Sequence, residues 1–242
     1  MDSIEDKPIE SKSGVASGVG VLDRAVSILS LLAADGPVSA ATVVEETGLS
    51  RPTAYRLLSA LETHHLITRR EGRYSLGVRL LGWAAAAGTG LVERAGPVLE
   101  RLRDATGEST QLYVREGEHR VCVASVERAT GLRDSVPVGA VMPLSRGSAG
   151  KVLLAWGEGE GSSYGIDAEK LEAVRSQGWA ESVAEREAGV ASVSVPVFGA
   201  DGSLRAAVSA SGPVSRLGER PGEQLAEEVV AAAREIETAL GS

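Results

Sequence analysis

The sequence has a single cysteine, Cys122, among its 242 residues. One thiol excludes an intramolecular disulfide and a thiolate cluster around a metal ion. We expect this residue to be a small buried hydrophobe in a strand rather than a redox sensor. Long apolar runs are also lacking: the stretch from Ala84 to Ala87 is far too short to span a bilayer, and no signal peptide is visible. We therefore predict a cytoplasmic protein without membrane association.

A net positive charge is lacking as well, because 33 acidic residues outnumber 25 lysines and arginines. The formal net charge is -8 and the pI is about 5.1, which argues against a nucleic-acid-binding protein. The charge is uneven, however, because between residues 51 and 79 only Glu62 and Glu71 oppose six arginines. These are Arg51, Arg56, Arg69, Arg70, Arg73 and Arg79. A small basic face on an acidic protein can still bind DNA, particularly when dimerisation doubles the contacts.

The chain is long enough for two domains with separate cores. Residues 1–20 mix charge, serine and glycine without apolar periodicity, so we predict a disordered tail. We predict a DNA-binding domain over residues 21–76, a linker helix over residues 77–90 and a second domain over residues 91–242. In the linker, Leu80, Leu81 and Trp83 are candidates for packing against a partner subunit.

The DNA-binding prediction depends on residues 37–76. The segment TVVEETG forms an amphipathic helix that ends at Gly48, and Ser50 and Pro52 begin a second helix as N-cap and first-turn residue. The second helix repeats apolar residues at the spacing of a buried stripe, namely Ala54, Leu57, Leu58 and Leu61. Two short strands then flank Glu71-Gly72, a turn suited to a hairpin. This order predicts a winged helix-turn-helix, whose second helix enters the major groove.

The polar face of that second helix supplies the candidate DNA contacts. They are Ser50, Arg51, Thr53, Tyr55 and Arg56, with Arg69, Arg70 and Arg73 from the wing. Arginine suits this role because its planar fork bridges guanine O6 and N7 or two phosphate oxygens. Each arginine could instead be a solvated surface charge, and Tyr55 could pack on the preceding helix.

The second half alternates strands and helices in an order that predicts an α+β domain, an antiparallel sheet flanked by helices. We expect a helix up to Thr106 that the Gly96-Pro97 pair interrupts, followed by strands in STQLYVREG, HRVCVASVE and RDSVPVG. The helix GSAGKVLLAW, a helix over residues 167–177, a hairpin around GADGS and a final helix over residues 222–240 follow.

Several separated blocks resemble the IclR family of bacterial transcription regulators. They include VLDRAVSILSLLA, TGLSRPTAYRLLSALETHHLI, GRYSLGVRL, PLSRGSAGKVLLAW and the segment from GWAESV to SASGP. Details such as AGPVLERLRDATGESTQLYVREG are similar to the actinobacterial NdgR or LtbR subgroup. The resemblance implies a GAF-like effector domain, dimers or dimers of dimers, and a repressor or dual regulator of amino-acid biosynthesis genes, leucine above all. Between Trp156 and Gly178 the chain is shorter than is usual in the family.

The resemblance also implies an effector site. Family members that bind oxo-acids hold the carboxylate at positions matching Ser148 and Ala149, and independently the start of a helix attracts anions. Facing polar positions match Ser182, Ser192, Ser209 and Ser211, of which the last two share one sheet face. Oxo-acid binders carry an acid and a thiol where this chain has Ser182 and Ser192. We therefore expect a larger amino or keto acid in a pocket that also includes Leu112, Val138 and Leu144, although strand serines are often mere spacers.

Enzyme patterns are incomplete. GSAGKV lacks the glycine at Leu144 or Ser145 and the hydroxyl at Val152 that a phosphate-binding loop requires. His64 and His65 are adjacent and point apart, so we predict neither a metal, a cofactor nor a catalytic residue; Lys151 is expected to stabilise charge or to lie in solvent. The alternative function is a metabolite-binding or enzymatic module whose winged helix does not bind DNA.

Overall fold

The computed structural model describes residues 17–86, 90–157 and 161–241. They form two compact units that divide between Thr89 and Gly90. The described part of the chain contains no helix long and apolar enough to cross a membrane. Most of the predicted tail, residues 1–16, and positions 87–89 of the predicted linker lie outside the described residues.

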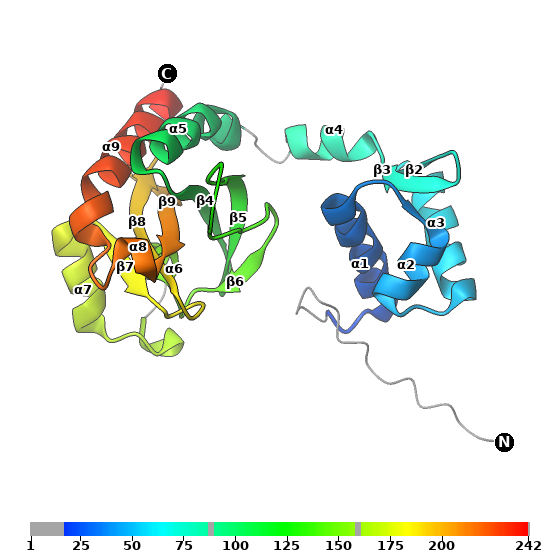
Figure 1. Ribbon diagram of the computed structural model, residues 1–242, viewed down its shortest axis with the longest axis horizontal. Helices are drawn as coiled ribbons and strands as arrows, with labels where there is room; N and C mark the ends of the chain where they lie inside the picture. The colour runs from blue at the N-terminus through cyan, green and yellow to red at the C-terminus, as the bar shows by residue number, and fades with distance from the viewer. Residues whose placement is uncertain (1–16, 87–89, 158–160, 242) are drawn as a thin grey trace. The chain divides into compact units, whose positions relative to one another are not determined.

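The first unit is a small helical domain with a three-stranded sheet (Figure 1). Its elements are α1 (Gly20–Asp35), β1 (Val38–Ser39), α2 (Ala40–Thr47), α3 (Arg51–Thr63), β2 (Ile67–Arg70), β3 (Arg73–Leu76) and α4 (Arg79–Ala86). The sheet order is β1-β3-β2, and all pairs are antiparallel. Ile28 of α1, Val43 of α2 and Leu58 of α3 meet in one core.

Local sequence signals explain these boundaries. Gly48 ends α2 in the left-handed region at φ 67°, and the Ser50 side chain accepts a hydrogen bond from Thr53 N at the start of α3. Glu71 and Gly72 both have positive φ in the tight turn between β2 and β3. The predicted winged helix-turn-helix is confirmed in its elements and their order.

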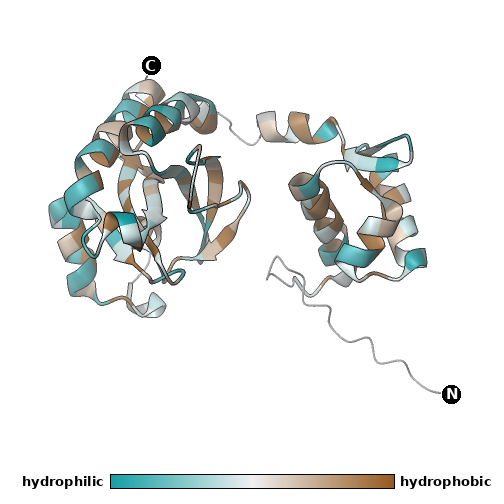
Figure 2. Cartoon of the chain, viewed as in Figure 1, coloured by the Kyte–Doolittle hydropathy of each residue, from teal (hydrophilic) through white to brown (hydrophobic). Residues whose placement is uncertain are grey.

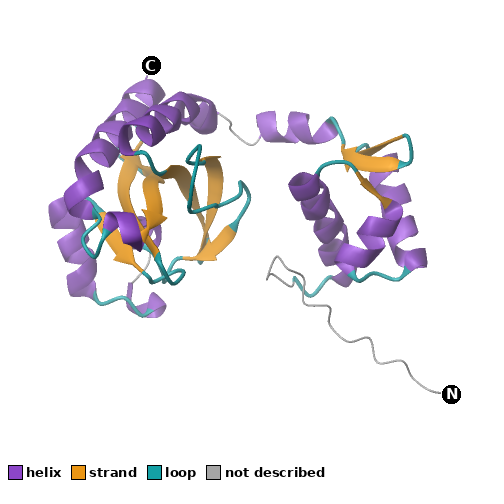
Figure 3. Cartoon of the chain, viewed as in Figure 1, coloured by secondary structure: helices purple, strands orange, loops and turns teal. Residues whose placement is uncertain are grey.

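The second unit is a six-stranded antiparallel sheet with helices on both faces (Figure 3). Its helices are α5 (Gly90–Thr106), α6 (Ser148–Trp156), a 3-10 turn (Gly161–Tyr164), α7 (Ala168–Gln177), α8 (Val214–Leu217) and α9 (Gly222–Gly241). Its strands are β4 (Ser109–Glu116), β5 (His119–Val126), β6 (Val141–Pro143), β7 (Ala180–Val183), β8 (Val190–Phe198) and β9 (Leu204–Pro213), in the order β6-β5-β4-β9-β8-β7.

Each face of this sheet has its own core. One core joins α5 and α9 to Val193, Val195 and Val197 of β8, and the other joins α6 and α7 to residues such as Cys122. Successive side chains of a strand point to opposite faces, so the valines of β8 face α5 and α9 while the intervening Ser192 and Ser194 face α6. The same alternation of apolar and polar residues along the strands is visible in Figure 2. It places a polar patch on the α6 side of the sheet.

Two predictions about secondary structure were wrong. Helix α5 continues through Pro97, because its apolar face packs in the core and compensates for one missing hydrogen bond. The segment RDSVPVG, residues 133–139, is not a strand. Pro137 has no N–H to donate to a neighbouring strand. The segment is held instead by the ion pair between Asp134 and Arg186. The edge strand forms later, at β6.

Candidate functional site

Helix α3 presents a cationic surface. Ala54, Leu58 and Leu61 are buried against the core, which turns Arg51 and Arg56 to solvent. Among the residues that the structure describes, no acidic side chain pairs with either arginine.

The remaining predicted residues of α3 fall into two groups. Ser50 and Thr53 stabilise the start of the helix: the Ser50 side chain accepts a hydrogen bond from Thr53 N, and the two hydroxyl oxygens lie 2.9 Å apart. The Tyr55 side chain is 54 % exposed, so the structure does not support its packing against α2. Tyr55 is thus available to a ligand together with the two arginines.

The wing carries the other three predicted arginines. Arg69 lies over the ring of Tyr74 at 5.4 Å, and Arg73 donates to Pro37 O at 3.2 Å. Both contacts hold the side chains on the wing. Arg70 is exposed next to the Glu71-Gly72 turn and forms no hydrogen bond or ion pair with another described side chain, so it is the wing arginine most free to reach outwards.

The second candidate site is a pocket on the α6 side of the large sheet. Its lining is Tyr113, Arg120, Asp134, Gly147, Ser148, Ala149, Ser182, Arg186, Val190, Ser192, Ser209 and Ser211. Six of the nine predicted effector residues are among them, namely both positions at the start of α6 and all four strand serines. The cavity volume is only about 20 Å³, which is room for about one water molecule. A larger ligand therefore requires the pocket to open.

The structure does not bring the other three predicted residues into this pocket. Leu112 is fully buried in the core formed with α5 and α9, on the opposite sheet face from Tyr113. Leu144 is fully buried in the core around α6, behind the lining. Val138 is 64 % exposed in the loop before β6.

A chain of serine hydroxyls crosses the floor of the pocket. Ser148 Oγ lies 2.7 Å from both Ser192 Oγ and Ser194 Oγ. Ser182 lies 3.0 Å from Ser192, and Ser194 donates to Ser209 at 3.0 Å. Ser148 is the central member, and Ser194, which was not predicted from the sequence, joins it to Ser209. A hydroxyl both donates and accepts, so this chain can reorient toward a bound polar group.

Charged residues that sequence reasoning missed line the same pocket. Arg120 is 2 % exposed, lies over the Tyr113 ring at 5.5 Å and donates to Arg146 O at 2.6 Å. Its Nε is buried without a hydrogen-bond partner. Burial lowers the pKa of Arg120 and raises that of Tyr113. Arg186 pairs with the buried Asp134 at 2.5 Å.

The start of α6 is the anion-attracting part of the pocket. Gly147, at φ 82°, precedes the helix, and Gly150 allows the Leu144 carbonyl to approach: a Cβ at position 150 would lie 2.2 Å from that oxygen. Gly147 N donates to Glu185 Oε2 at 3.1 Å, and Glu185 also forms an ion pair with Lys151. This helix start therefore already holds a carboxylate from the chain itself.

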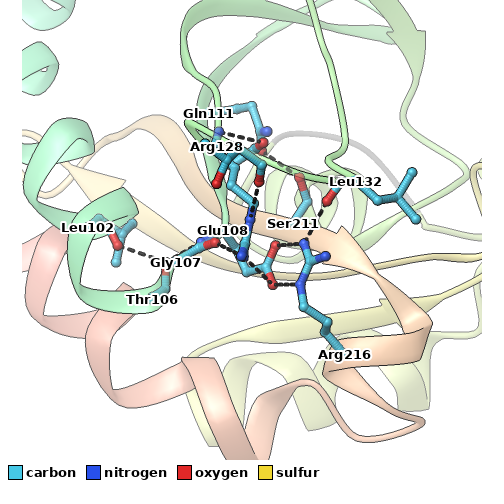
Figure 4. Close-up of polar contacts among 11 residues, drawn as sticks. Leu102, Thr106, Gly107, Glu108, Gln111, Arg128, Leu132, Ser211 and Arg216 are labelled. Carbon is cyan, nitrogen blue, oxygen red and sulfur yellow. Dashed lines mark hydrogen bonds and ion pairs between the residues drawn. The ribbon is translucent and has the colours of Figure 1, made fainter.

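A further ion-pair cluster supports the loop that carries Asp134 (Figure 4). Arg216 pairs with Glu108 and donates to Leu132 O at 2.9 Å, and Arg128 Nη1 lies 3.6 Å from Glu108. An open groove of about 420 Å³ adjoins this cluster. Both arginines already bind Glu108, so we regard the groove as a supporting feature rather than as the effector site.

Metal binding finds no support in the described ranges. They contain no group of three histidine, cysteine, aspartate or glutamate residues placed to hold a metal ion.

Comparison with known proteins identifies the family. The IclR helix-turn-helix domain model matches residues 21–71, and the model described as the bacterial transcriptional regulator IclR C-terminal domain matches residues 83–168 and 168–238. RhmR of Escherichia coli, an uncharacterized HTH-type transcriptional regulator, is 31% identical over 247 residues, which cover 93% of this chain and 95% of RhmR. The HTH-type transcriptional repressor AllR of Escherichia coli is 28% identical, over 97% of this chain and 95% of AllR.

Solved structures agree with this result. The crystal structure of an IclR homolog from Microbacterium hydrocarbonoxydans, complexed with 4-hydroxybenzoate, aligns with a TM-score of 0.68 and 25% identity. The alignment covers 91% of this chain and 98% of that chain. The matched families and relatives are transcriptional regulators and not enzymes. With both of its units matched by family models, this chain belongs to the IclR family of bacterial transcriptional regulators.

Proposed function

We propose that the protein binds operator DNA through α3 and the wing and that a small carboxylate in the α6 pocket changes its affinity for that DNA. The observation that carries the DNA part is the solvent-facing pair Arg51 and Arg56 on α3, which no described acidic side chain neutralises. Ser50, Thr53, Tyr55 and the wing arginines complete the proposed surface. The protein would act in the cytoplasm.

The proposed regulon is a set of amino-acid biosynthesis genes, leucine genes above all, under repression or dual control. Its support is the resemblance to the NdgR and LtbR subgroup in the blocks quoted above. The proposed effector is an amino or keto acid, and its support is a pocket in which Ser182 and Ser192 provide hydroxyls beside an anion-attracting helix start. Calorimetry with leucine, 4-methyl-2-oxopentanoate, methionine and tryptophan tests this class, which is wrong if all four are silent.

We also propose a homo-oligomer, either a dimer or a dimer of dimers. Exposed apolar side chains gather on α1, where Val21 is 63 % and Leu22 53 % exposed, and on α4, where Leu81 is 71 % and Trp83 53 % exposed. Partner helices would remove these surfaces from water. A two-fold dimer would also set two α3 helices on half-sites about one helical turn apart. Light scattering of wild type and Leu81→Glu tests this, since the variant should shift toward monomer.

The decisive experiment measures DNA binding as a function of salt. Footprinting on the upstream region of the protein's own gene would locate the operator, and gel shifts at several salt concentrations would compare wild type with Arg51→Ala/Arg56→Ala. Phosphate contacts release counterions, so the wild-type affinity should fall steeply with salt. The control is Arg205→Ala, whose arginine pairs with Asp201 in the second unit. Absence of any preferred fragment would instead favour a metabolite-binding module with a non-DNA-binding winged helix.

A further inference from the structure

The turn between β7 and β8 places one of its own carboxylates at the effector pocket. Glu185 Oε2 accepts a hydrogen bond from Gly147 N at 3.1 Å, and Glu185 Oε1 pairs with Lys151 Nζ. Gly147 directly precedes Ser148 and Ala149, whose N–H groups are the proposed seat of the effector carboxylate. The first N–H groups of a helix have no acceptor within the helix and attract anions. Glu185 thus occupies part of the proposed anion position.

Two carboxylates would compete for this place. Amides of consecutive residues in one turn lie close together, so an effector carboxylate on Ser148 and Ala149 would be next to the Glu185 carboxylate, and like charges at such separation repel. Space is also short, because the cavity has a volume of about 20 Å³. Arg120 adds a positive charge that favours an anion there, since it lines the pocket, is 2 % exposed and has a buried Nε without a partner.

Lys151 would remain in place after Glu185 leaves. Its Nζ also donates to the Glu181 carbonyl at 2.9 Å, and this contact does not involve Glu185. The cation would therefore stay at the helix start as a counter-charge for an incoming anion. Glu185 can leave into solvent, because its side chain is already 34 % exposed.

The rest of the turn is held independently. Arg186 pairs with Asp134, whose side chain is 5 % exposed, across 2.5 Å. Ala184 N donates to Val190 O at 2.8 Å, and this bond helps to hold Ala184 in its left-handed conformation at φ 56°. The structure therefore provides an anchored turn with one releasable carboxylate.

We propose that Glu185 is an internal competitor that a carboxylate effector must displace, so that this side chain helps to determine the pocket's selectivity for anionic ligands. The proposal rests on the proposed effector site. It assigns Glu185 a role at the binding step, distinct from the serines that would contact the ligand.

The test compares Glu185→Gln with Glu187→Gln. The first variant keeps a side chain of similar shape but removes the competing charge. The second removes a charge from the same turn that lies 3.5 Å from Arg186 Nη1 and does not reach Gly147 or Lys151. Calorimetry would use 4-methyl-2-oxopentanoate and its neutral primary amide. We expect Glu185→Gln to bind the carboxylate about 5-fold more tightly or better, corresponding to loss of a partly exposed ion pair. Glu185→Gln should bind the neutral amide ligand with the same affinity as the wild type. Glu187→Gln should bind the carboxylate with the same affinity as the wild type.

A second measurement needs no ligand. Hydrogen exchange of the Gly147 amide should be faster in Glu185→Gln than in Glu187→Gln, because the amide acceptor of glutamine is weaker than a carboxylate. Equal exchange rates of the Gly147 amide in the two variants would overturn the proposal. The proposal would also fail if the wild type bound the carboxylate and Glu185→Gln bound it no more tightly. Silence of all three proteins toward 4-methyl-2-oxopentanoate, leucine, methionine and tryptophan would refute the proposed effector class and, with it, displacement; the other results leave that class intact.

Discussion

Glu108 and Arg216 form a two-pronged ion pair in which Arg216 Nε and Nη2 each lie 2.6 Å from a carboxylate oxygen. Only 4 % of the Glu108 side chain is exposed, against 32 % of Arg216. The hydrogen bond to Glu108 raises the pKa of Arg216, so the arginine stays charged at any pH at which the protein folds. Because Arg216 also donates to Leu132 O, the pair fixes the loop whose Asp134 reaches the effector pocket.

Arg216→Ala should destabilise the second unit. The substitution leaves a buried carboxylate with only Arg128, 3.6 Å away, as its partner. Breaking a fully buried pair costs about 3–5 kcal/mol, and the partial exposure of Arg216 reduces our expectation to about 2 kcal/mol. Urea unfolding monitored by circular dichroism measures this loss of unfolding free energy. Arg220→Ala is the control, since its pair with Glu223 is exposed (77% and 69%), and should stay within about 0.5 kcal/mol of wild type.

Two helical glycines should respond to alanine in opposite directions. At Gly150 a Cβ would lie 2.2 Å from Leu144 O and 3.1 Å from Arg120, so Gly150→Ala must displace the backbone at the start of α6 and should cost several kcal/mol. At Gly82 in α4 a Cβ would meet nothing within 4 Å, and Gly82→Ala should stabilise that helix by about 0.5–1 kcal/mol. Thermal unfolding of the wild type and the two variants measures both changes as shifts in Tm. A stable Gly150→Ala protein would contradict the close approach.

The helix-turn-helix was predictable from sequence because its signals are local. Gly48, Ser50 and Gly72 act within one turn of their own positions. The shared face of Ser209 and Ser211 was equally predictable, since it follows from the two-residue period of a strand.

The rest of the pocket depends on tertiary structure. A two-residue period shows which residues share a face but not which face it is, so Leu112 was assigned to the pocket although its neighbour Tyr113 lines it. Arg186 and Asp134 lie 52 residues apart in sequence, and charged side chains are expected at the surface by default. No pattern in the sequence brings them together.

Ser194→Ala should weaken the serine chain without collapsing it. Ser194 is fully buried and joins Ser148 to Ser209. After its loss Ser148 keeps Ser192, and Ser209 keeps its bond to Val193 O, so the expected cost is near the low end for a buried hydrogen bond, about 1 kcal/mol. The urea midpoint measures this loss. Ser176→Ala, at an exposed position of α7, serves as the control, and an equal effect of the two would argue against a cooperative chain.

Cys122 should make stability depend on alkaline pH. Burial raises the pKa of its thiol from 9.0 to about 12. Below pH 9 the thiol is protonated in both states; between pH 9 and about 12 the unfolded chain loses the proton that the folded chain retains, so stability falls as pH rises. Urea midpoints from pH 8 to 10 should fall more steeply for wild type than for Cys122→Ser. Alkylation by iodoacetamide should be slow until urea unfolds the protein. Rapid alkylation of the native protein would contradict burial.

Arg56→Ala and Arg70→Ala should separate base contacts from phosphate contacts. Arg56 lies on the solvent face of α3, so its loss should cost about 1–3 kcal/mol of operator affinity, concentrated at one base position. Arg70 lies at the exposed tip of the wing, where phosphates are the available partners; its loss should weaken binding equally on all sequences and lower the salt slope by about 1. Gel shifts with single-base operator variants at several salt concentrations measure both effects. If Arg56→Ala weakened operator and random DNA equally, α3 would hold the backbone in this protein and the sequence would have to be read by other residues.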